Sequence, residues 1–130
     1  MNENLSPKEI LVVDDDPDYV DLIRLRLETS GYQVSCVSNG LEALNLLEKS
    51  YRPDLIVLDI EMPDKNGLTT LINLNVRRLR EKNESQIPII VATGLRSEAI
   101  RSLLTEQKIS AYLTKPYDAG ELIEKIHRLI

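Results

Sequence analysis

The sequence predicts an α/β protein built on a doubly wound, five-stranded parallel sheet. Short apolar runs alternate along the 130 residues with longer segments of helical spacing, and three of these runs contain almost no polar residue. A strand without polar alternation is covered on both faces, as in a parallel sheet flanked by helices. The other two runs alternate more and suit the edges of the sheet. Strict alternation of strand and helix at this length favours one open sheet in one domain.

Five segments are too short for helices and are mostly rich in β-branched residues, so we predict strands there. These strands cover residues 10–13, 33–37, 55–58, 87–92 and 109–113. Residues 9–130 form the predicted domain, and residues 1–8 are polar enough to be a flexible lead-in.

Each predicted strand is followed by an amphipathic helix, which gives five helices. Asp16 and Pro17 supply an N-cap acceptor and a proline at the first helical position. Asn39 with Glu42 is typical of a capping box, and Asp118 precedes the last helix. The apolar stripes predicted to face the core are Val20, Ile23 and Leu27; Ala43, Leu44 and Leu47; Leu68, Leu71, Ile72, Val76 and Leu79; Ile100, Leu103 and Leu104 (after Ser97); and Leu122, Ile126 and Leu129.

Composition excludes several classes of function. The net charge is −5, whereas binding to nucleic acid needs a surplus of Lys and Arg. A single cysteine, Cys36, excludes an internal disulfide framework and a cysteine-built zinc site. No apolar run approaches the roughly 20 residues that span a bilayer, and no secretion leader opens the chain. We therefore expect a cytoplasmic protein that binds neither nucleic acid nor membrane.

Polar side chains follow four of the predicted strands at the point where each strand ends. Asp14 and Asp15 come after the first strand, Asp59 ends the third, Thr93 follows the fourth, and Lys115 follows the fifth. Ligands of doubly wound sheets bind at the carboxyl ends of the strands, so these side chains are expected to meet at one edge.

The chemistry of this edge predicts a cation. Two carboxylates about 4 Å apart repel by roughly 4 kcal/mol at an effective dielectric constant near 20, so either their pKa values rise or a cation enters. Because only oxygen ligands are offered, Mg²⁺ is the expected ion. Lys115 could neutralise one carboxylate and later bind phosphate. Asp59 is a plausible nucleophile that forms an acyl phosphate, and Thr93 could bind a phosphoryl oxygen.

These residues, in this order, resemble the receiver domain of two-component response regulators, over about residues 8–130. The resemblance is carried by four segments: Ile10–Asp16, Pro53–Pro63 with Gly67, Thr93–Gly94 and Tyr112–Pro116. It implies a flavodoxin-like sheet with strand order 2-1-3-4-5, as in chemotaxis receivers. It also implies a signalling protein rather than an enzyme, apart from its own phosphorylation and dephosphorylation.

The resemblance implies a role for each residue of the site. Asp59 corresponds to the phosphoacceptor, Thr93 to the switch hydroxyl, Lys115 to the phosphate-binding lysine, and Tyr112 to the switch aromatic residue. The Lys115–Pro116 bond corresponds to one that is usually cis. The implied Mg²⁺ ligands are the carboxylates of Asp14, Asp15 and Asp59 and the backbone carbonyl of Glu61.

The resemblance also implies partners. A sensor histidine kinase or a phosphotransfer protein would donate the phosphoryl group to Asp59. A downstream protein would then bind the face made by the predicted fourth helix, fifth strand and fifth helix. The length leaves no room for an output domain in this chain.

Two other functions are compatible with parts of the sequence. Asp14 and Asp16, spaced two apart after a strand, are similar to the nucleophile motif of haloacid-dehalogenase-type phosphatases, although that family has no role for Asp59. A non-phosphorylated interaction module on the same fold is the other alternative, and it would be expected to lack Asp59 or Lys115.

Overall fold

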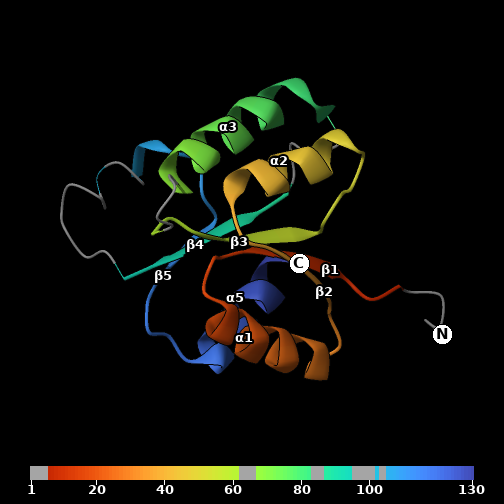
Figure 1. Cartoon of the computed structure of the whole chain (residues 1–130), viewed down its shortest axis with the longest axis vertical. Helices are drawn as coiled ribbons and strands as arrows, with labels where there is room; N and C mark the ends of the chain where they lie inside the picture. Colours follow the sequence, from red (N-terminus) through yellow and green to blue (C-terminus); the bar gives the residue numbers. More distant parts are fainter. Residues whose placement is uncertain (1–5, 62–66, 83–86, 95–101, 103–104) are drawn as a thin grey trace.

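In the computed structural model of the chain, which describes residues 6–61, 67–82, 87–94, 102 and 105–130, five parallel strands form one sheet (Figure 1). They are β1 (Glu9–Val13), β2 (Gln33–Val37), β3 (Leu55–Asp59), β4 (Ile89–Thr93) and β5 (Ala111–Thr114). Their order is β2-β1-β3-β4-β5, which confirms the predicted order, and the two alternating strands β2 and β5 lie at the edges. Every neighbouring pair is parallel, so all carboxyl ends meet at one edge.

Helices cover both faces of the sheet, as predicted. α1 (Pro17–Thr29) and α5 (Ala119–Leu129) lie on one face, and α2 (Gly40–Glu48) and α3 (Gly67–Arg80) lie on the other (Figure 1). Because successive strand residues point to opposite faces, each face buries its own aliphatic core. The strands contribute Ile10, Val12, Leu55, Val57, Ile90, Ala92 and Leu113 to the α1/α5 core, and Leu11, Val13, Ile56, Leu58, Ile89 and Val91 to the α2/α3 core.

Capping side chains start three of the helices. Asp16 caps α1 and Asp118 caps α5, as predicted. The Asn39 side chain accepts a hydrogen bond from the N–H of Glu42 at 2.9 Å. The Glu42 carboxylate reaches back to the N–H of Ser38, also at 2.9 Å, so the predicted capping box closes one residue earlier than its usual form.

The predicted apolar stripe of α3 is wrong for three of its residues. Ile72, Val76 and Leu79 were expected in the core, but they are 42%, 47% and 89% exposed. The buried residues of α3 are instead Gly67, Thr70, Leu71 and Leu74. Apolar residues occupy two sides of this helix, and close packing against α2 determines which side faces the core. A side chain at Gly40 of α2 would collide with Thr70, so the small residues of α3 are the ones that fit beside α2.

The ends of two strands also differ from the prediction. β4 begins two residues later than expected, after Pro88, which has no N–H to donate to the sheet. β5 begins at Ala111 instead of residue 109. The helix predicted after Ser97 falls on a segment in which residues 95–101 and 103–104 lie outside the described residues, as do residues 1–5 of the predicted lead-in. Among the described helices, none has the length and apolar character needed to cross a bilayer.

A polar cluster joins β1 and β2 to the loop that precedes β3. The Glu9 carboxylate accepts hydrogen bonds from Tyr51 at 2.5 Å and from Ser35 at 2.7 Å. The Glu9 N–H in turn donates to the Asp54 carboxylate at 2.7 Å. Burial raises the pKa of Tyr51 far above its ordinary value, and the hydrogen bond to Glu9 adds to this, so the phenol stays a donor.

Substitution of Tyr51 by phenylalanine is expected to lower the free energy of unfolding by about 1–3 kcal/mol, because the part-buried Glu9 carboxylate loses a donor. Urea denaturation at pH 7 measures this change. Tyr32→Phe is the matched control, since the Tyr32 hydroxyl meets exposed His127 at 3.1 Å and its loss should cost less than about 0.5 kcal/mol. Equal losses in the two variants would contradict the prediction.

Candidate functional site

The predicted site residues meet at the carboxyl edge of four adjacent strands. Asp14 directly follows β1, Asp59 ends β3, Thr93 ends β4 and Lys115 directly follows β5. The Lys115 N–H donates to the Thr93 carbonyl at 2.8 Å, which continues the β4–β5 pairing by one residue and fixes where the lysine leaves the sheet. The strand ends predicted that these residues lie at one edge of the sheet, and their roles there stay predictions.

Strand alternation explains which side chains touch. Asp14, Asp59 and Lys115 continue the series of residues that face the α1/α5 core, whereas Thr93 continues the opposite series. Three charged groups are thus directed to the same side of the sheet edge.

Lys115 bridges the two buried carboxylates. Its Nζ lies 2.7 Å from Asp14 Oδ2 and 3.3 Å from Asp59 Oδ2. Asp14 is 5% exposed and Asp59 is 4% exposed. Asp15 is more exposed, and carboxylate oxygens of Asp14, Asp15 and Asp59 all lie within 4.8 Å of one another. Three carboxylates with one ammonium leave a net negative charge at the edge of the sheet.

The pKa shifts follow from this arrangement. Burial raises the pKa of Asp59 above its ordinary value, against the opposing influence of the Glu61 N–H and the Lys115 ammonium. Burial alone would lower the pKa of Lys115, but its contacts with Asp14 and Asp59 outweigh burial and raise it. Lys115 therefore stays a charged ammonium at neutral pH, whereas the negative charge of Asp59 is destabilised by its burial.

Glu61 links the ends of β3 and β4. Its N–H donates to Asp59 Oδ1 at 2.8 Å, and its carboxylate accepts from the Gly94 N–H at 2.6 Å. The predicted role of Glu61 concerned its backbone carbonyl, and it remains a prediction. The contact between the Glu61 side chain and Gly94 was not predicted, because residues 33 apart in the sequence give no local signal.

The two predicted switch residues lie on β4 and β5, and both belong to the strand series that faces the α2/α3 core. Thr93 is fully buried, and it stands opposite Thr114 in the β4–β5 register. Tyr112 is half-buried on β5 and packs against the α2/α3 core. The Lys115–Pro116 bond is cis.

Sequence reasoning missed an aromatic pair next to Lys115. Lys115 Nζ lies 4.4 Å from the centroid of the Tyr19 ring, and this ring contacts the Tyr117 ring edge to face. A signal was present, because Tyr19 precedes Ile23 and Leu27 at intervals of four and extends their buried stripe to the start of α1. Burial raises the pKa of both tyrosines, so both phenols are neutral at pH 7.

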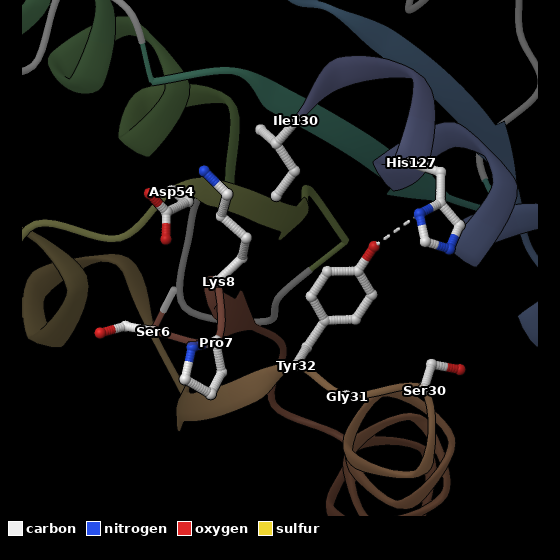
Figure 2. A pocket seen from close by; sticks show the side chains of 9 residues that line it. All are labelled: Ser6, Pro7, Lys8, Ser30, Gly31, Tyr32, Asp54, His127 and Ile130. Carbon is white, nitrogen blue, oxygen red and sulfur yellow. Dashed lines mark hydrogen bonds between the residues drawn. The ribbon is translucent and has the colours of Figure 1, made fainter. Parts of the chain in front are cut away.

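A hollow of about 610 Å³ lies at the opposite edge of the sheet (Figure 2). It is lined by Ser6–Lys8, by the turn between α1 and β2, by Asp54 and by the end of α5. Figure 2 shows the hydrogen bond between Tyr32 and His127 on its wall. This hollow contains none of the residues that gather at the carboxyl edge.

Comparison with known proteins identifies the family. Residues 10–127 match the response regulator receiver domain, so the chain belongs to this family of two-component signalling domains. An uncharacterized 14.6 kDa protein of Leptolyngbya boryana, from the sodA1 3′ region, is 38% identical over 127 residues, which cover 97% of this chain and 92% of that protein.

Two further similarities add detail about relatives. The transcriptional regulatory protein CpxR of Escherichia coli K12 is 38% identical over 122 residues, which cover 94% of this chain and 49% of CpxR. The chain thus spans about half the length of CpxR. The receiver domain of sensor histidine kinase PA1611 from Pseudomonas aeruginosa PAO1 superimposes with a TM-score of 0.82 at 28% identity, covering 95% of this chain and 97% of that domain. That structure holds a magnesium ion in its active site cleft.

Proposed function

We propose that Asp59 accepts a phosphoryl group from a phosphohistidine of a sensor histidine kinase or phosphotransfer protein, in a Mg²⁺-dependent reaction. The observation that carries this proposal is the Lys115 ammonium, which bridges the buried carboxylates of Asp14 and Asp59 at a sheet edge otherwise rich in acids. A nucleophile, a cation for the phosphoryl oxygens and a set of metal ligands thus lie together, with Lys115 Nζ within 3.3 Å of Asp59 and the three carboxylates within 4.8 Å of one another.

The transfer exchanges one bond to phosphorus for another. A carboxylate oxygen of Asp59 attacks the phosphorus atom and forms an acyl phosphate, while the bond from phosphorus to the imidazole nitrogen breaks and its electron pair returns to the ring. Asp59 suits this role because burial weakens the solvation of its carboxylate. The Lys115 ammonium can move from the carboxylate to an incoming phosphoryl oxygen over a short distance, because it already donates to Asp59.

The donor set fits Mg²⁺. Asp14, Asp15 and Asp59 offer hard oxygen ligands within 4.8 Å of one another, and neither histidine nor cysteine belongs to this group. Bound there, the ion would neutralise charge that develops on the phosphoryl oxygens. The carboxylates repel one another when no ion is bound, and a divalent cation between them would offset this repulsion.

We extend the proposal to a switch. Phosphorylation adds a charge of about −2 and strong acceptor oxygens beside Thr93 and Lys115. Their rearrangement would bias Tyr112 and the face around β5 and α5, where a downstream protein would bind. The half-buried position of Tyr112, against the core and close to the surface, supports a side chain with two available positions.

The test is incubation of the protein with acetyl phosphate and Mg²⁺, followed by intact-mass measurement. The wild type should gain one phosphoryl group, and Asp59→Asn should gain none. Asp54→Asn is a matched control, because Asp54 precedes β3 at the opposite edge of the sheet. Equal labelling of wild type and Asp59→Asn would overturn the assignment of the acceptor.

The hydrogen bonds of Asp16 argue against a haloacid-dehalogenase-type phosphatase. Asp16 would be the acid of that motif, but its carboxylate accepts hydrogen bonds from the N–H groups of Asp18 and Tyr19 and caps α1. Hydrolysis of a phosphate ester that depends on Asp14 but not on Asp59 would favour that enzyme instead.

Glu61→Gln is expected to speed labelling by acetyl phosphate about two- to fivefold at low ionic strength. The Glu61 carboxylate occupies the Gly94 N–H and adds a negative charge near Asp59, so it should repel an anionic donor. Initial labelling rates at low and high salt measure the effect, which should shrink as salt screens the charge. Glu124→Gln, on exposed α5, is the control, and a rate unchanged by Glu61→Gln would contradict the prediction.

A further inference from the structure

The Lys115 ammonium is enclosed by an aromatic wall as well as by carboxylates. Its Nζ lies 4.4 Å from the centroid of the Tyr19 ring. The Tyr19 and Tyr117 rings meet edge to face, with centroids 5.5 Å apart and an interplanar angle of 89°. Tyr19 comes from the first turn of α1, whereas Tyr117 comes from the segment between β5 and α5. The wall therefore joins two parts of the chain at the lysine.

An aromatic face attracts an ammonium, and the attraction is stronger where water is excluded. The Lys115 side chain is 18% exposed, so little water competes with the ring. A lysine side chain has a flexible stem of four carbons and loses much rotamer freedom when it is fixed. The carboxylates hold the ammonium from one side, and the Tyr19 ring adds a further contact that limits the positions that the ammonium can take.

We propose that Tyr19 is a positioning residue for phosphoryl transfer, whose ring holds the Lys115 ammonium against Asp14 and Asp59 so that it is in place when the phosphoryl group arrives. This inference rests on the proposed function. Preorganisation of this kind lowers the cost of ordering the site during reaction. It acts through the lysine, since the Tyr19 ring itself contacts the ammonium.

The position of Lys115 should also affect the affinity for Mg²⁺. The direction of that change distinguishes a released lysine from general damage to the site. Lys115 and Mg²⁺ compete for Asp14, because the ammonium already lies 2.7 Å from Asp14 Oδ2. A lysine released from its aromatic wall should compete less, so the affinity for Mg²⁺ should rise. General damage to the site would instead disorder the carboxylates and lower that affinity.

The experiment compares Tyr19→Leu, which removes the ring, with Tyr19→Phe, which keeps it. Tyr32→Leu is the matched control, because Tyr32 lies on the wall of the hollow at the other sheet edge. Three quantities are measured on the full chain: the labelling rate at saturating acetyl phosphate, the Mg²⁺ dissociation constant, and the NMR shifts of the Lys115 side-chain protons, which a neighbouring ring moves upfield.

For Tyr19→Leu, the labelling rate at saturation should fall about three- to tenfold, the range expected for a cation–π contact. The Mg²⁺ dissociation constant should decrease, and the upfield shift of the Lys115 protons should disappear. Tyr19→Phe should restore all three quantities to wild-type values, and Tyr32→Leu should leave them unchanged.

Two results would overturn the inference while the proposed function stands. One is a Tyr19→Leu variant that labels at the wild-type rate. The other is a Tyr19→Phe variant as slow as Tyr19→Leu, which would assign the effect to the hydroxyl. A wild type that acquires no phosphoryl group from either acetyl phosphate or a phosphohistidine donor would instead overturn the proposed function itself, and the Lys115 NMR shifts would still report whether the ring holds the ammonium.

Discussion

Replacing Lys115 by methionine is expected to lower the free energy of unfolding by about 3–5 kcal/mol in Mg²⁺-free buffer at pH 7, because it leaves buried carboxylates without their cation. Asp14 and Asp59 are each at most 5% exposed, and Lys115 Nζ contacts both. Urea denaturation in the presence of EDTA measures the loss. Added Mg²⁺ should stabilise Lys115→Met more than it stabilises the wild type, since the ion replaces the missing positive charge.

The matched control for this prediction is Arg128→Met on α5. Arg128 is 70% exposed and pairs with Glu124 at 3.4 Å, so its loss should cost less than about 1 kcal/mol. The pH dependence gives a second check. The pKa of Lys115 is raised above the ordinary 10.5, so its stabilising effect is complete below that value and is lost as the pH rises through the folded-state pKa. A Lys115→Met variant as stable as wild type at pH 7 would contradict the buried ion pair.

Asp59→Asn is expected to have the opposite effect on stability. In Mg²⁺-free buffer at pH 7, we expect the free energy of unfolding to rise by about 1–3 kcal/mol, because a buried charge that is held at a cost becomes neutral. The asparagine keeps an oxygen for the Glu61 N–H, and Lys115 keeps Asp14. Mg²⁺ should reverse the order, since it stabilises the wild type through a ligand that the variant lacks.

The pH dependence of this gain has a definite sign. Because the pKa of Asp59 is raised in the folded state, its charge destabilises the fold fully above that raised pKa and not at all below the ordinary value of 3.8. The advantage of Asp59→Asn should therefore fade as the pH falls toward 4. Asp21→Asn, on the exposed side of α1, should change stability by less than about 0.5 kcal/mol at any of these pH values. A gain that persists unchanged at low pH would refute the explanation.

The sequence predicted the fold because two of its signals are local. Unbroken apolar runs identify β1, β3 and β4 as strands covered on both faces, and a polar residue directly after a run marks the sheet edge where ligands bind. The cluster of Asp14, Asp59 and Lys115 follows from these signals. Their meeting at one edge follows from the rule that parallel strands end together, whereas the strand order 2-1-3-4-5 came from the family resemblance.

Other features depend on packing between distant segments, and sequence patterns could not determine them. The exposed face of α3 was assigned to the core because Ile72 and Leu79 also fit a helical stripe, and only the approach of Gly40 to Thr70 decides the orientation. The contact between Glu61 and Gly94 depends on how two loops meet. The burial of Tyr19 could have been predicted, because this residue extends the buried stripe of α1 by one turn. Only the fold shows that its ring lies beside Lys115.

The hollow opposite the site shows where a label or a tether can be attached to the molecule without covering the site. Ser6 and Ile130 both lie on its wall, so both ends of the described chain are at the edge of the sheet away from Asp59 (Figure 2). A strand of five residues rises about 16 Å, which separates the two edges. A fluorescent label, an affinity tag or a surface tether joined at Ile130 would leave the carboxylate edge open, and molecules immobilised there would present that edge to a phosphodonor in solution.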